Sequence, residues 1–325
     1  MTTVAVTGAS GFVGGAVCRA AAAAGLRVLA YGRRPAIDPA HVAGAPYRAW
    51  DITAGPLDGP EPVDAVVHCA AAVTDWGRAA EVRLTNVAGT ANVLASFPAP
   101  ARFVHVSSAS VYDPRRPTVR ATEDQAPARR YLNDYGRTKA AAEALVAQAV
   151  AAGREAVVLR PRAVYGPGDP TLLPRLLAAA GRDTLLVPGD GTQLASLTSV
   201  ANLAAACLLA ATGPVRAGVF NVTDAEPVVL VQALRTLLAE CGLPARVRPV
   251  PAGPVRALAA AAELAWRAAG RPGPPPLTRY AVANLAVERT LDIGAARAAL
   301  GYRPAPTSFA GAGRWTAAAG ASLPG

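Results

Sequence analysis

The feature that most limits the fold of this chain is an apolar strand that runs through a glycine turn into a helix. Residues 3–7 (TVAVT) form the strand, and Gly8, Gly11 and Gly14 space the turn. Glycines in this setting let the backbone approach a pyrophosphate, which binds at the helix N-terminus. The segment therefore predicts a dinucleotide site, although its spacing is one residue longer than the usual Gly-x-Gly-x-x-Gly.

Strand-like and helix-like segments continue to alternate as far as residue 161. Further strands are predicted at residues 27–31, 63–72, 101–108 and 155–161, with a short one before Asp51. This alternation predicts an α/β fold with a doubly wound parallel sheet. Later in the chain we expect helices at 174–180 and 197–211, a strand at 218–222, and a helical chain with proline-rich loops from Glu226 onward.

A helix predicted at residues 255–270 is apolar around most of its circumference. We expect it in the core, with a substrate wall and a membrane-surface patch as the alternatives. No apolar run reaches the ~20 residues of a membrane span, so an integral span is not expected.

Tyr135 and Lys139 are the strongest candidates for chemistry. A helix is predicted over residues 131–152, with Asn133 or Asp134 as its cap and Gly153 at its end. Residues four apart share one face, so the phenol and the ammonium point into the same space. A nearby cation favours the phenolate, which makes tyrosine usable as an acid or base near neutral pH.

Lys139 is also the only lysine among 32 basic side chains. Arginine is bulkier, planar and permanently charged, so it replaces lysine poorly where a compact charge is needed. This usage favours a functional role for the pair over a chance spacing.

Charge and cysteine usage argue against several other classes. The arginines behind the net charge of +10 are spread along the chain, so no nucleic-acid partner is expected. Four scattered cysteines and three dispersed histidines suggest reduced thiols and no metal site. The first strand begins almost at Met1, which leaves no room for a signal peptide. We therefore expect a cytoplasmic protein.

Two arginines where the second strand ends indicate which dinucleotide is bound. NAD-specific folds place a carboxylate there, but this chain has Gly32-Arg33-Arg34 and no acid before Asp38. Guanidinium groups suit a 2′-phosphate. NADP(H) is therefore the preferred cofactor, and NAD(H) is the alternative.

Small and hydroxyl side chains follow two later strands. The segment 63–72 ends in alanines, above which a cofactor can pass closely, and a loop at 74–77 (TDWG) follows. Ser107 and Ser108 come at the end of another strand, at the edge where open α/β sheets bind ligands. A hydroxyl there can hydrogen-bond a substrate oxygen.

With these motifs in hand, the chain resembles the extended short-chain dehydrogenase/reductases of the NAD-dependent epimerase/dehydratase superfamily. The resemblance rests on the glycine turn, Asp51, HCAA at 68–71, NVAGT at 86–90, the serine segment, the Tyr/Lys pair and RPRAVYGPGD at 160–169. It implies Ser108, Tyr135 and Lys139 as a catalytic triad, in which Tyr135 is the acid/base. Lys139 would lower the Tyr135 pKa and hold the nicotinamide ribose, and Asn86 would support the proton path.

The same resemblance implies the other contacts and the domain division. Cofactor contacts are expected at Gly8, Ser10, Gly11, Phe12, Val13, Gly14, Arg33, Arg34, Asp51, Ile52, Ala70, Ala71, Ala72, Ser107, Tyr135, Lys139, Pro161 and Val164. Substrate contacts are expected at Thr74, Trp76, Ser108, Ala109 and Tyr165. A Rossmann-type domain would comprise residues 1–161 plus about 195–222. A smaller, mainly helical substrate domain would comprise residues 162–194 and 223–325.

Three branches of this family compete. Residues 108–112 read Ser-Ala-Ser-Val-Tyr, which lacks the acid pair of the sugar dehydratases. UDP-sugar epimerases resemble this segment, but Ala163 stands where they usually carry a diphosphate-binding Asn. The 3β-hydroxysteroid dehydrogenase-like branch resembles the chain at residues 75–77, 200–202 and 275–304.

The third branch is therefore expected, with hydride transfer between NADP(H) and a ketone or secondary alcohol on a hydrophobic small molecule. A nucleotide-sugar epimerase and a non-catalytic NADP-binding regulator are the alternatives. A homodimer stays open.

Overall fold

The computed structural model describes residues 1–180, 184–243, 245–271 and 273–315. A seven-stranded sheet has the order β12-β7-β5-β4-β1-β2-β3, and all of its strand pairs are parallel. The strands are β1 (Thr3–Thr7), β2 (Arg27–Gly32), β3 (Tyr47–Ala49), β4 (Ala65–His68), β5 (Arg102–Val106), β7 (Ala156–Pro161) and β12 (Ala217–Val222). From β1 the chain adds β2 and β3 on one side, and then β4, β5, β7 and β12 on the other side. The strand order therefore reverses between β1 and β4, and such sheets bind ligands at this switch point.

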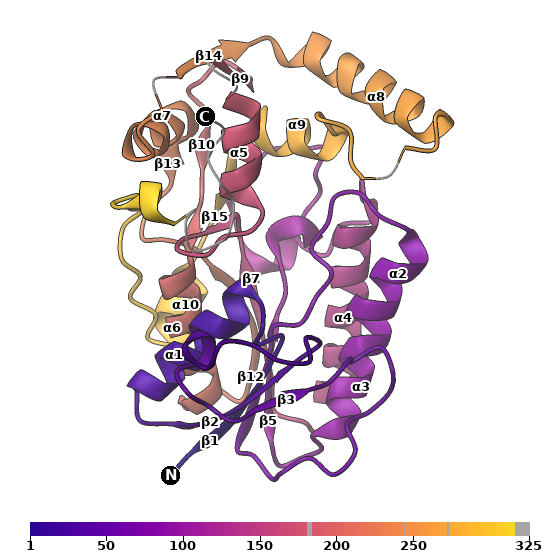
Figure 1. Ribbon diagram of the computed structural model, residues 1–325, viewed down its shortest axis with the longest axis vertical. Coiled ribbons are helices and arrows are strands. Elements are labelled where there is room, and N and C mark those ends of the chain that lie inside the picture. Colours follow the sequence, from indigo (N-terminus) through magenta and orange to yellow (C-terminus); the bar gives the residue numbers. More distant parts are fainter. Residues whose placement is uncertain (181–183, 244, 272, 316–325) are drawn as a thin grey trace.

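Helices cover both faces of the sheet, as the alternation of strands and helices predicts (Figure 1). Val4 and Val6 of β1 pack toward α1 (Phe12–Ala23) and α6 (Val200–Thr212) in one core cluster. Ala5, between them, faces the opposite cluster, which includes residues of α3 (Gly89–Ser96) and α4 (Asp134–Ala151). The fold class is therefore confirmed.

The rest of the chain forms a smaller part with short strands as well as helices. Its helices are α5 (Leu172–Ala180), α7 (Leu230–Glu240), α8 (Ala252–Ala268) and α9 (Arg279–Leu285). One small sheet has the order β13 (Val228–Val229), β10 (Leu194–Ala195), β15 (Arg289–Leu291), β6 (Thr118–Ala121). The other two pair β14 (Arg246–Val250) with β9 (Thr184–Pro188), and β11 (Thr198–Ser199) with β8 (Val164–Tyr165). Strands β13, β14 and β15 after Glu226 are missing from the expected helices and loops, because strands of two to five residues are too short to show a pattern.

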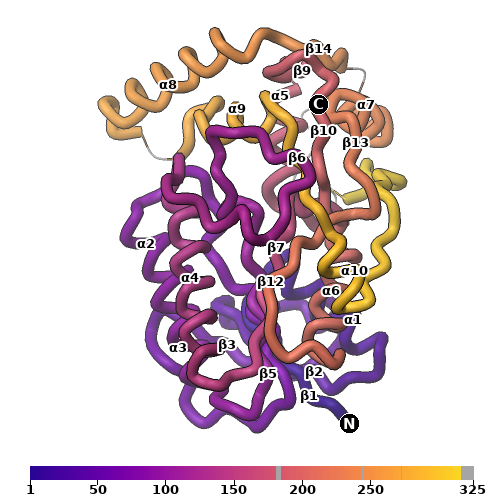
Figure 2. Tube along the Cα trace, turned by 180° about the vertical axis from the view of Figure 1, so that it is seen from behind, coloured from indigo at the N-terminus to yellow at the C-terminus, as the bar shows by residue number. Residues whose placement is uncertain are grey.

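Two segments cross between the parts, which modifies the expected division of the chain. Strand β6 comes from within residues 1–161 but pairs with β15 of the small sheet. Conversely, Ile293 and Tyr302, which flank α10 (Gly294–Ala299), pack in the same core cluster as Val4. Figure 2 shows α10 beside α6 and α1. With these two exchanges, we keep the division into a cofactor part and a substrate part as a proposal.

Helix α8 lies on the surface, so its expected place in the core is wrong. Leu258 is 63% exposed and Leu264 is 72% exposed, while Ala259 and Glu263 are the buried residues of this helix. Glu263 accepts hydrogen bonds from the backbone N–H and Nε of Arg279, at 2.7 and 2.8 Å. Alanine offers little apolar area to bury, so this ionic anchor to α9 holds a helix that projects beyond its neighbours (Figure 1).

Candidate active site

The glycine turn lies against the end of β4, at the point where the strand order reverses. Gly8 has φ +69°, and a Cβ atom there would lie 2.6 Å from the backbone N of Ala70. A Cβ on Gly14 would lie 2.2 Å from the Gly8 carbonyl oxygen. Helix α1 starts at this turn with no side-chain cap and no acidic residue in its first turn. Its first N–H groups therefore suit a phosphate, and the backbone leaves room for one.

Arg33 and Arg34 lie beside this turn. A Cβ on Gly32 would lie 2.7 Å from Ser10 Oγ, which shows how closely the end of β2 approaches the turn. Both arginine side chains are exposed, and neither forms an ion pair with any described residue. Their guanidinium groups are available to an anion.

Asp51 and Ile52 follow β3 along the same edge. Hydrogen bonds from the backbone N and the Oγ1 of Thr53 lower the Asp51 pKa, and the nearby Arg33 also favours the carboxylate. Ile52 is buried, and its carbonyl oxygen accepts a 2.7 Å hydrogen bond from Asn92 Nδ2. Both residues are therefore held in place after β3 by these hydrogen bonds.

Helix α4 carries the Tyr/Lys pair, and it begins and ends where the caps predict. Asn133 is its N-cap and accepts a 3.1 Å hydrogen bond from the backbone N of Gly136. Lys139 is buried, and its Nζ donates to the Val106 carbonyl oxygen at 2.7 Å. Burial lowers its pKa to about 8, opposed by Glu143.

Tyr135 begins a chain of hydroxyl groups. Its side chain lies beside Ser108, whose Oγ lies 2.9 Å from Ser110 Oγ, and Ser110 Oγ lies 2.6 Å from the hydroxyl of Tyr280. Burial raises the Tyr135 pKa, opposed by the Ser108 hydrogen bond. The Tyr135 pKa is therefore raised overall, and the Lys139 ammonium is bonded to the Val106 carbonyl oxygen.

Asn86 ties the end of β4 to α4 from a π-helical turn, Leu84–Ala88. Its Oδ1 accepts from the Ala72 backbone N at 2.7 Å, and its Nδ2 donates to Thr138 Oγ1 at 3.0 Å. Thr138 in turn donates to the Tyr135 carbonyl oxygen at 3.1 Å. Asn86 therefore positions the alanines of residues 70–72 and the first turn of α4, as π-bulges at functional sites often do.

Several polar residues beneath the site are not predicted by the sequence analysis. His68 bridges β1 and α3, with Nδ1 2.7 Å from Thr7 Oγ1 and Nε2 3.0 Å from Thr90 Oγ1. Burial lowers its pKa to about 3, so it is neutral. The sequence signal for His68 and Thr90 is that they belong to the HCAA and NVAGT motifs.

Glu143 forms a second buried group one turn after Lys139. It pairs with Arg160 at 2.8 Å and accepts a 2.5 Å hydrogen bond from Ser107 Oγ. The Ser107 hydroxyl is therefore engaged by α4 and its backbone N–H by Leu159 O, which leaves its carbonyl oxygen as the part that could meet a cofactor. This ion pair holds α4 to β7, whose last residue, Pro161, and the following Val164 lie at the same sheet edge.

The five expected substrate residues do not all lie at one site. Thr74 and Trp76 form a tight loop through a hydrogen bond from Trp76 N to Thr74 Oγ1 at 3.0 Å, and Arg267 of α8 covers the Trp76 ring at 4.9 Å. Ala109 lies in the 3₁₀ turn that follows Ser108. Tyr165 is instead buried in the second core cluster, and its hydroxyl donates to Asp224 at 2.7 Å. It is placed as a core residue, because its ring packs on Phe309 and its hydroxyl is already bonded.

The described residues contain neither a candidate metal site nor a helix that could span a membrane. No cluster of three or more His, Cys, Asp or Glu side chains there could hold a metal ion. Within the same residues, no helix combines the length and the apolar character needed to cross a membrane.

Comparisons with known proteins agree with this geometry. A model of the NAD dependent epimerase/dehydratase family matches residues 4–223. A 2-alkyl-3-oxoalkanoate reductase of Stenotrophomonas maltophilia is 32% identical over 92% of this chain and 94% of its own. A 4-hydroxy-2-methyl-3-oxo-4-farnesyl-3,4-dihydroquinoline-1-oxide ketoreductase of Stigmatella aurantiaca is 34% identical, over 91% of this chain and 90% of its own.

Among solved structures, UDP-glucuronic acid 4-epimerase from Bacillus cereus in complex with NAD superposes with a TM-score of 0.70. It is 21% identical and covers 95% of this chain and 93% of its own, a likeness of fold. The chain belongs to the NAD dependent epimerase/dehydratase family. The reductase relatives confirm the prediction that the protein is an oxidoreductase acting on a hydroxyl/carbonyl pair. They favour this activity over that of an epimerase.

Proposed function

We propose that this protein is an NADPH-dependent reductase of a ketone on a hydrophobic molecule. The observation that carries the proposal is the placement of Tyr135 beside Ser108, on a helix whose next turn buries Lys139. A hydroxyl pair at the carboxyl edge of a parallel sheet, beside a glycine cradle for a dinucleotide, suits hydride transfer.

The residues would share the work as follows. The nicotinamide, when bound, supplies the hydride that reduces the carbonyl carbon. Ser108 donates a hydrogen bond to the carbonyl oxygen, and Tyr135 transfers its proton to that oxygen as the alkoxide forms. Lys139, which holds a proton at Nζ below pH 8, provides the positive charge that favours the resulting phenolate. Asn86 keeps α4 and residues 70–72 in register.

The substrate class follows from the relatives. One acts, by its name, on 2-alkyl-3-oxoalkanoates and another on a farnesylated quinoline, and both carry a ketone and an apolar chain. Burial of an apolar chain contributes roughly 25 cal/mol per Å². We infer that this chain also reduces a ketone with an apolar substituent. The Thr74–Trp76 loop and the 3₁₀ turn at Ala109 are proposed as its contacts.

The direct test is NADPH oxidation with a panel of 2-alkyl-3-oxoalkanoates and aromatic ketones, followed as loss of absorbance. We expect turnover with at least one of them. In parallel, calorimetric titration of the protein–NADP complex with UDP-glucose should show no binding. Micromolar binding of UDP-glucose without ketone reduction would instead support a nucleotide-sugar epimerase.

Cofactor choice is the next prediction, and it rests on the free guanidinium groups of Arg33 and Arg34. Charge-assisted hydrogen bonds to a 2′-phosphate contribute about 1.5–3 kcal/mol, so NADPH should bind at least ~10-fold more tightly than NADH. Arg33→Ala should remove most of this difference, measured by fluorescence titration of both cofactors.

The matched control is Arg116→Ala, an exposed arginine away from the glycine turn, which should leave both affinities unchanged. Equal affinities for NADPH and NADH in the unmutated protein would contradict the prediction and favour NAD(H).

Two further proposals concern the protein as a whole. The four cysteines form no disulfide, and burial raises the pKa of each thiol, which fits a reducing, cytoplasmic compartment. Homodimer formation remains a prediction.

A further inference from the structure

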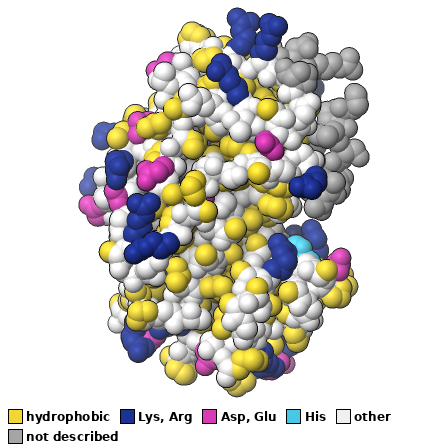
Figure 3. Space-filling model, turned by 90° about the vertical axis from the view of Figure 1, so that its left-hand side faces the viewer, with side chains coloured by type: hydrophobic (Ala, Val, Ile, Leu, Met, Phe, Trp, Pro, Cys, Tyr) yellow, Lys and Arg dark blue, Asp and Glu magenta, His cyan; other side chains and the backbone are white. Residues whose placement is uncertain are grey.

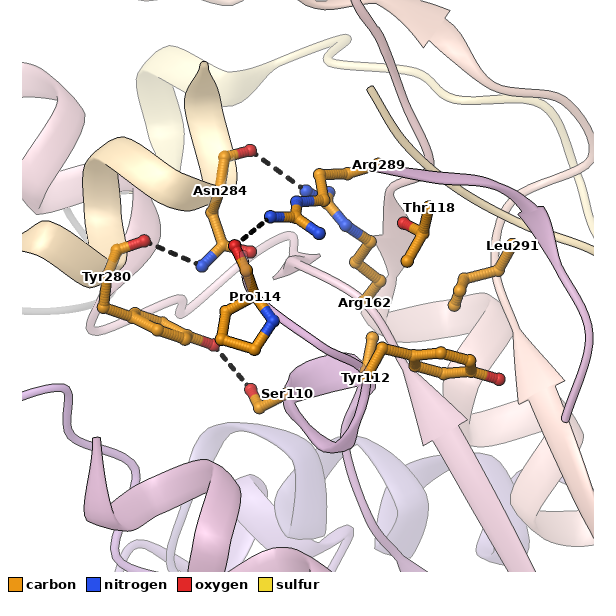
Figure 4. A pocket seen from close by; sticks show the side chains of 10 residues that line it. Ser110, Tyr112, Pro114, Thr118, Arg162, Tyr280, Asn284, Arg289 and Leu291 are labelled. Carbon is orange, nitrogen blue, oxygen red and sulfur yellow. Dashed lines mark hydrogen bonds between the residues drawn. The ribbon is translucent and has the colours of Figure 1, made fainter. Parts of the chain in front are cut away.

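A small cavity lies beyond the catalytic serine, between the 3₁₀ turn and α9. Its volume is about 20 Å³, and its polar lining includes Ser110, Tyr280, Asn284, Arg162 and Arg289. Figure 4 shows the two arginine side chains next to each other, with Tyr280 reaching down to Ser110. Two neighbouring guanidinium groups give the cavity a strongly positive character.

The two arginines differ in how their donors are used. Arg289 donates through all three of its nitrogen atoms to the carbonyl oxygens of residues 113, 114, 116 and 283, so its role is structural. Arg162 donates once from Nη1 to Ser196 O at 2.9 Å, and once from Nη2 to Asn284 O at 3.3 Å. Of the five N–H donors of a guanidinium group, three on Arg162 have no partner among the described residues.

No acidic side chain neutralises Arg162 within the described chain. The acids that act on its neighbours are engaged elsewhere, since Asp113 pairs with Arg115 at 2.8 Å and Asp75 with Arg175 at 2.8 Å. Burial and the adjacent Arg289 lower the Arg162 pKa to about 10, which still leaves it charged at neutral pH. A half-buried cation without a counter-ion is costly unless a ligand supplies one.

The cavity connects to the reacting atoms through one residue. Ser110 lines the cavity, and its Oγ lies 2.9 Å from the Oγ of Ser108, which lies beside Tyr135. Tyr280 hydrogen-bonds the same Ser110 Oγ and acts electrostatically on Arg162. An anionic group bound at Ser110 and Arg162 would therefore lie next to a substrate carbonyl bound at Ser108.

We propose that Arg162, with Ser110 and Tyr280, binds a carboxylate of the substrate, so that the enzyme selects 3-oxo acids over neutral ketones. The inference rests on the proposed ketoreductase function and adds the substrate's charged group. In a 3-oxo acid the carboxylate carbon is two bonds from the ketone carbon, and the Oγ atoms of Ser108 and Ser110 lie 2.9 Å apart. The cavity holds about one water-sized group, which admits a carboxylate oxygen and is too small for a diphosphate.

The test uses the reverse reaction, because 3-hydroxy acids are chemically stable. The full-length protein with NADP⁺ would oxidise 2-methyl-3-hydroxydecanoate and its methyl ester, which differ in the negative charge and in one methyl group. We expect kcat/KM for the acid to exceed that for the ester by about 10- to 150-fold, the fold-change that corresponds to a charge-assisted hydrogen bond. In Arg162→Met the acid-to-ester ratio should fall to about one, mainly through KM for the acid, and Arg162→Lys should keep part of the preference.

The acid-to-ester ratio cancels any general loss of activity caused by the substitution. An acid-to-ester ratio of kcat/KM near one in the unmutated protein would overturn the carboxylate site without contradicting ketone reduction. This measurement needs no variant. An unchanged acid preference in a folded Arg162→Met also overturns it. Failure of every ketone and alcohol, acid and ester alike, would instead count against the proposed function and remove the inference with it.

Discussion

Replacement of Tyr135 by phenylalanine should abolish turnover while leaving NADPH binding nearly intact. The substitution removes one hydroxyl, the end of the chain that joins Tyr135 to Ser108 and Tyr280, and keeps the ring. Loss of a general acid typically costs ~10²–10⁴-fold in rate. The measurement is kcat for ketone reduction, with NADPH affinity measured separately by fluorescence.

Tyr131→Phe provides a matched control. Tyr131 is close to Tyr135 in the sequence and also half-buried, but its hydroxyl is not part of that chain. It should keep kcat within a few-fold of the parent. If Tyr135→Phe itself retained such a rate, another group would have to supply the proton, and the proposed mechanism would be wrong.

Lys139→Arg should also remove most activity, although it conserves the positive charge. The ammonium is buried and donates at 2.7 Å to the Val106 carbonyl oxygen, beside buried His68 and His105. A planar guanidinium is larger and does not fit this site without moving its neighbours. We expect kcat/KM to fall by about 10²-fold or more.

The reciprocal change Arg137→Lys is the control. Arg137 lies on the same helix, is exposed and pairs with Asp134 at 2.7 Å, so activity should not change. Near-normal activity of Lys139→Arg would mean that charge alone matters at this position. The use of a single lysine in the chain would then need another explanation.

The pH dependence of stability gives a second readout for Lys139. Its pKa in the folded protein is about 8, below the ordinary 10.5, so between these values the unfolded chain binds more protons than the folded one. Stability from this group therefore rises as pH increases from 8 to 10.5, by on the order of 3 kcal/mol. Lys139→Met should lack this rise, so its stability relative to the parent should decrease over that interval, as measured by urea unfolding.

The sequence predicts those parts of the fold that repeat a strong local pattern. Strands such as β1 and β5, and α4 with its Asn133 cap, show apolar periodicity and recognisable ends, and the structure has them where expected. Strands β8, β10, β11 and β13 are two residues long and exist only because a distant partner pairs with them. Helix α8 shows the opposite failure, because its apolar composition gives no information about whether anything covers it.

The candidate site divides in the same way. Ser108, Tyr135 and Asn86 belong to motifs close to strand or helix ends, so their neighbourhood can be inferred from chain order. Tyr280 reaches Ser110 across 170 positions of sequence, and Arg162 depends on the Asn284 carbonyl for its placement. These contacts form when α9 packs against the 3₁₀ turn. No local sequence pattern predicts them.

The placement of residues 293–302 in the first core has a consequence for how the protein is made. Val4 and Val6 come from the start of the chain, yet Ile293, Leu300 and Tyr302 complete the cluster in which they are buried. A ribosome must therefore deliver about three hundred residues before the glycine cradle rests on a finished core. During synthesis the nascent sheet would expose part of this apolar face until residues 293–302 have been added.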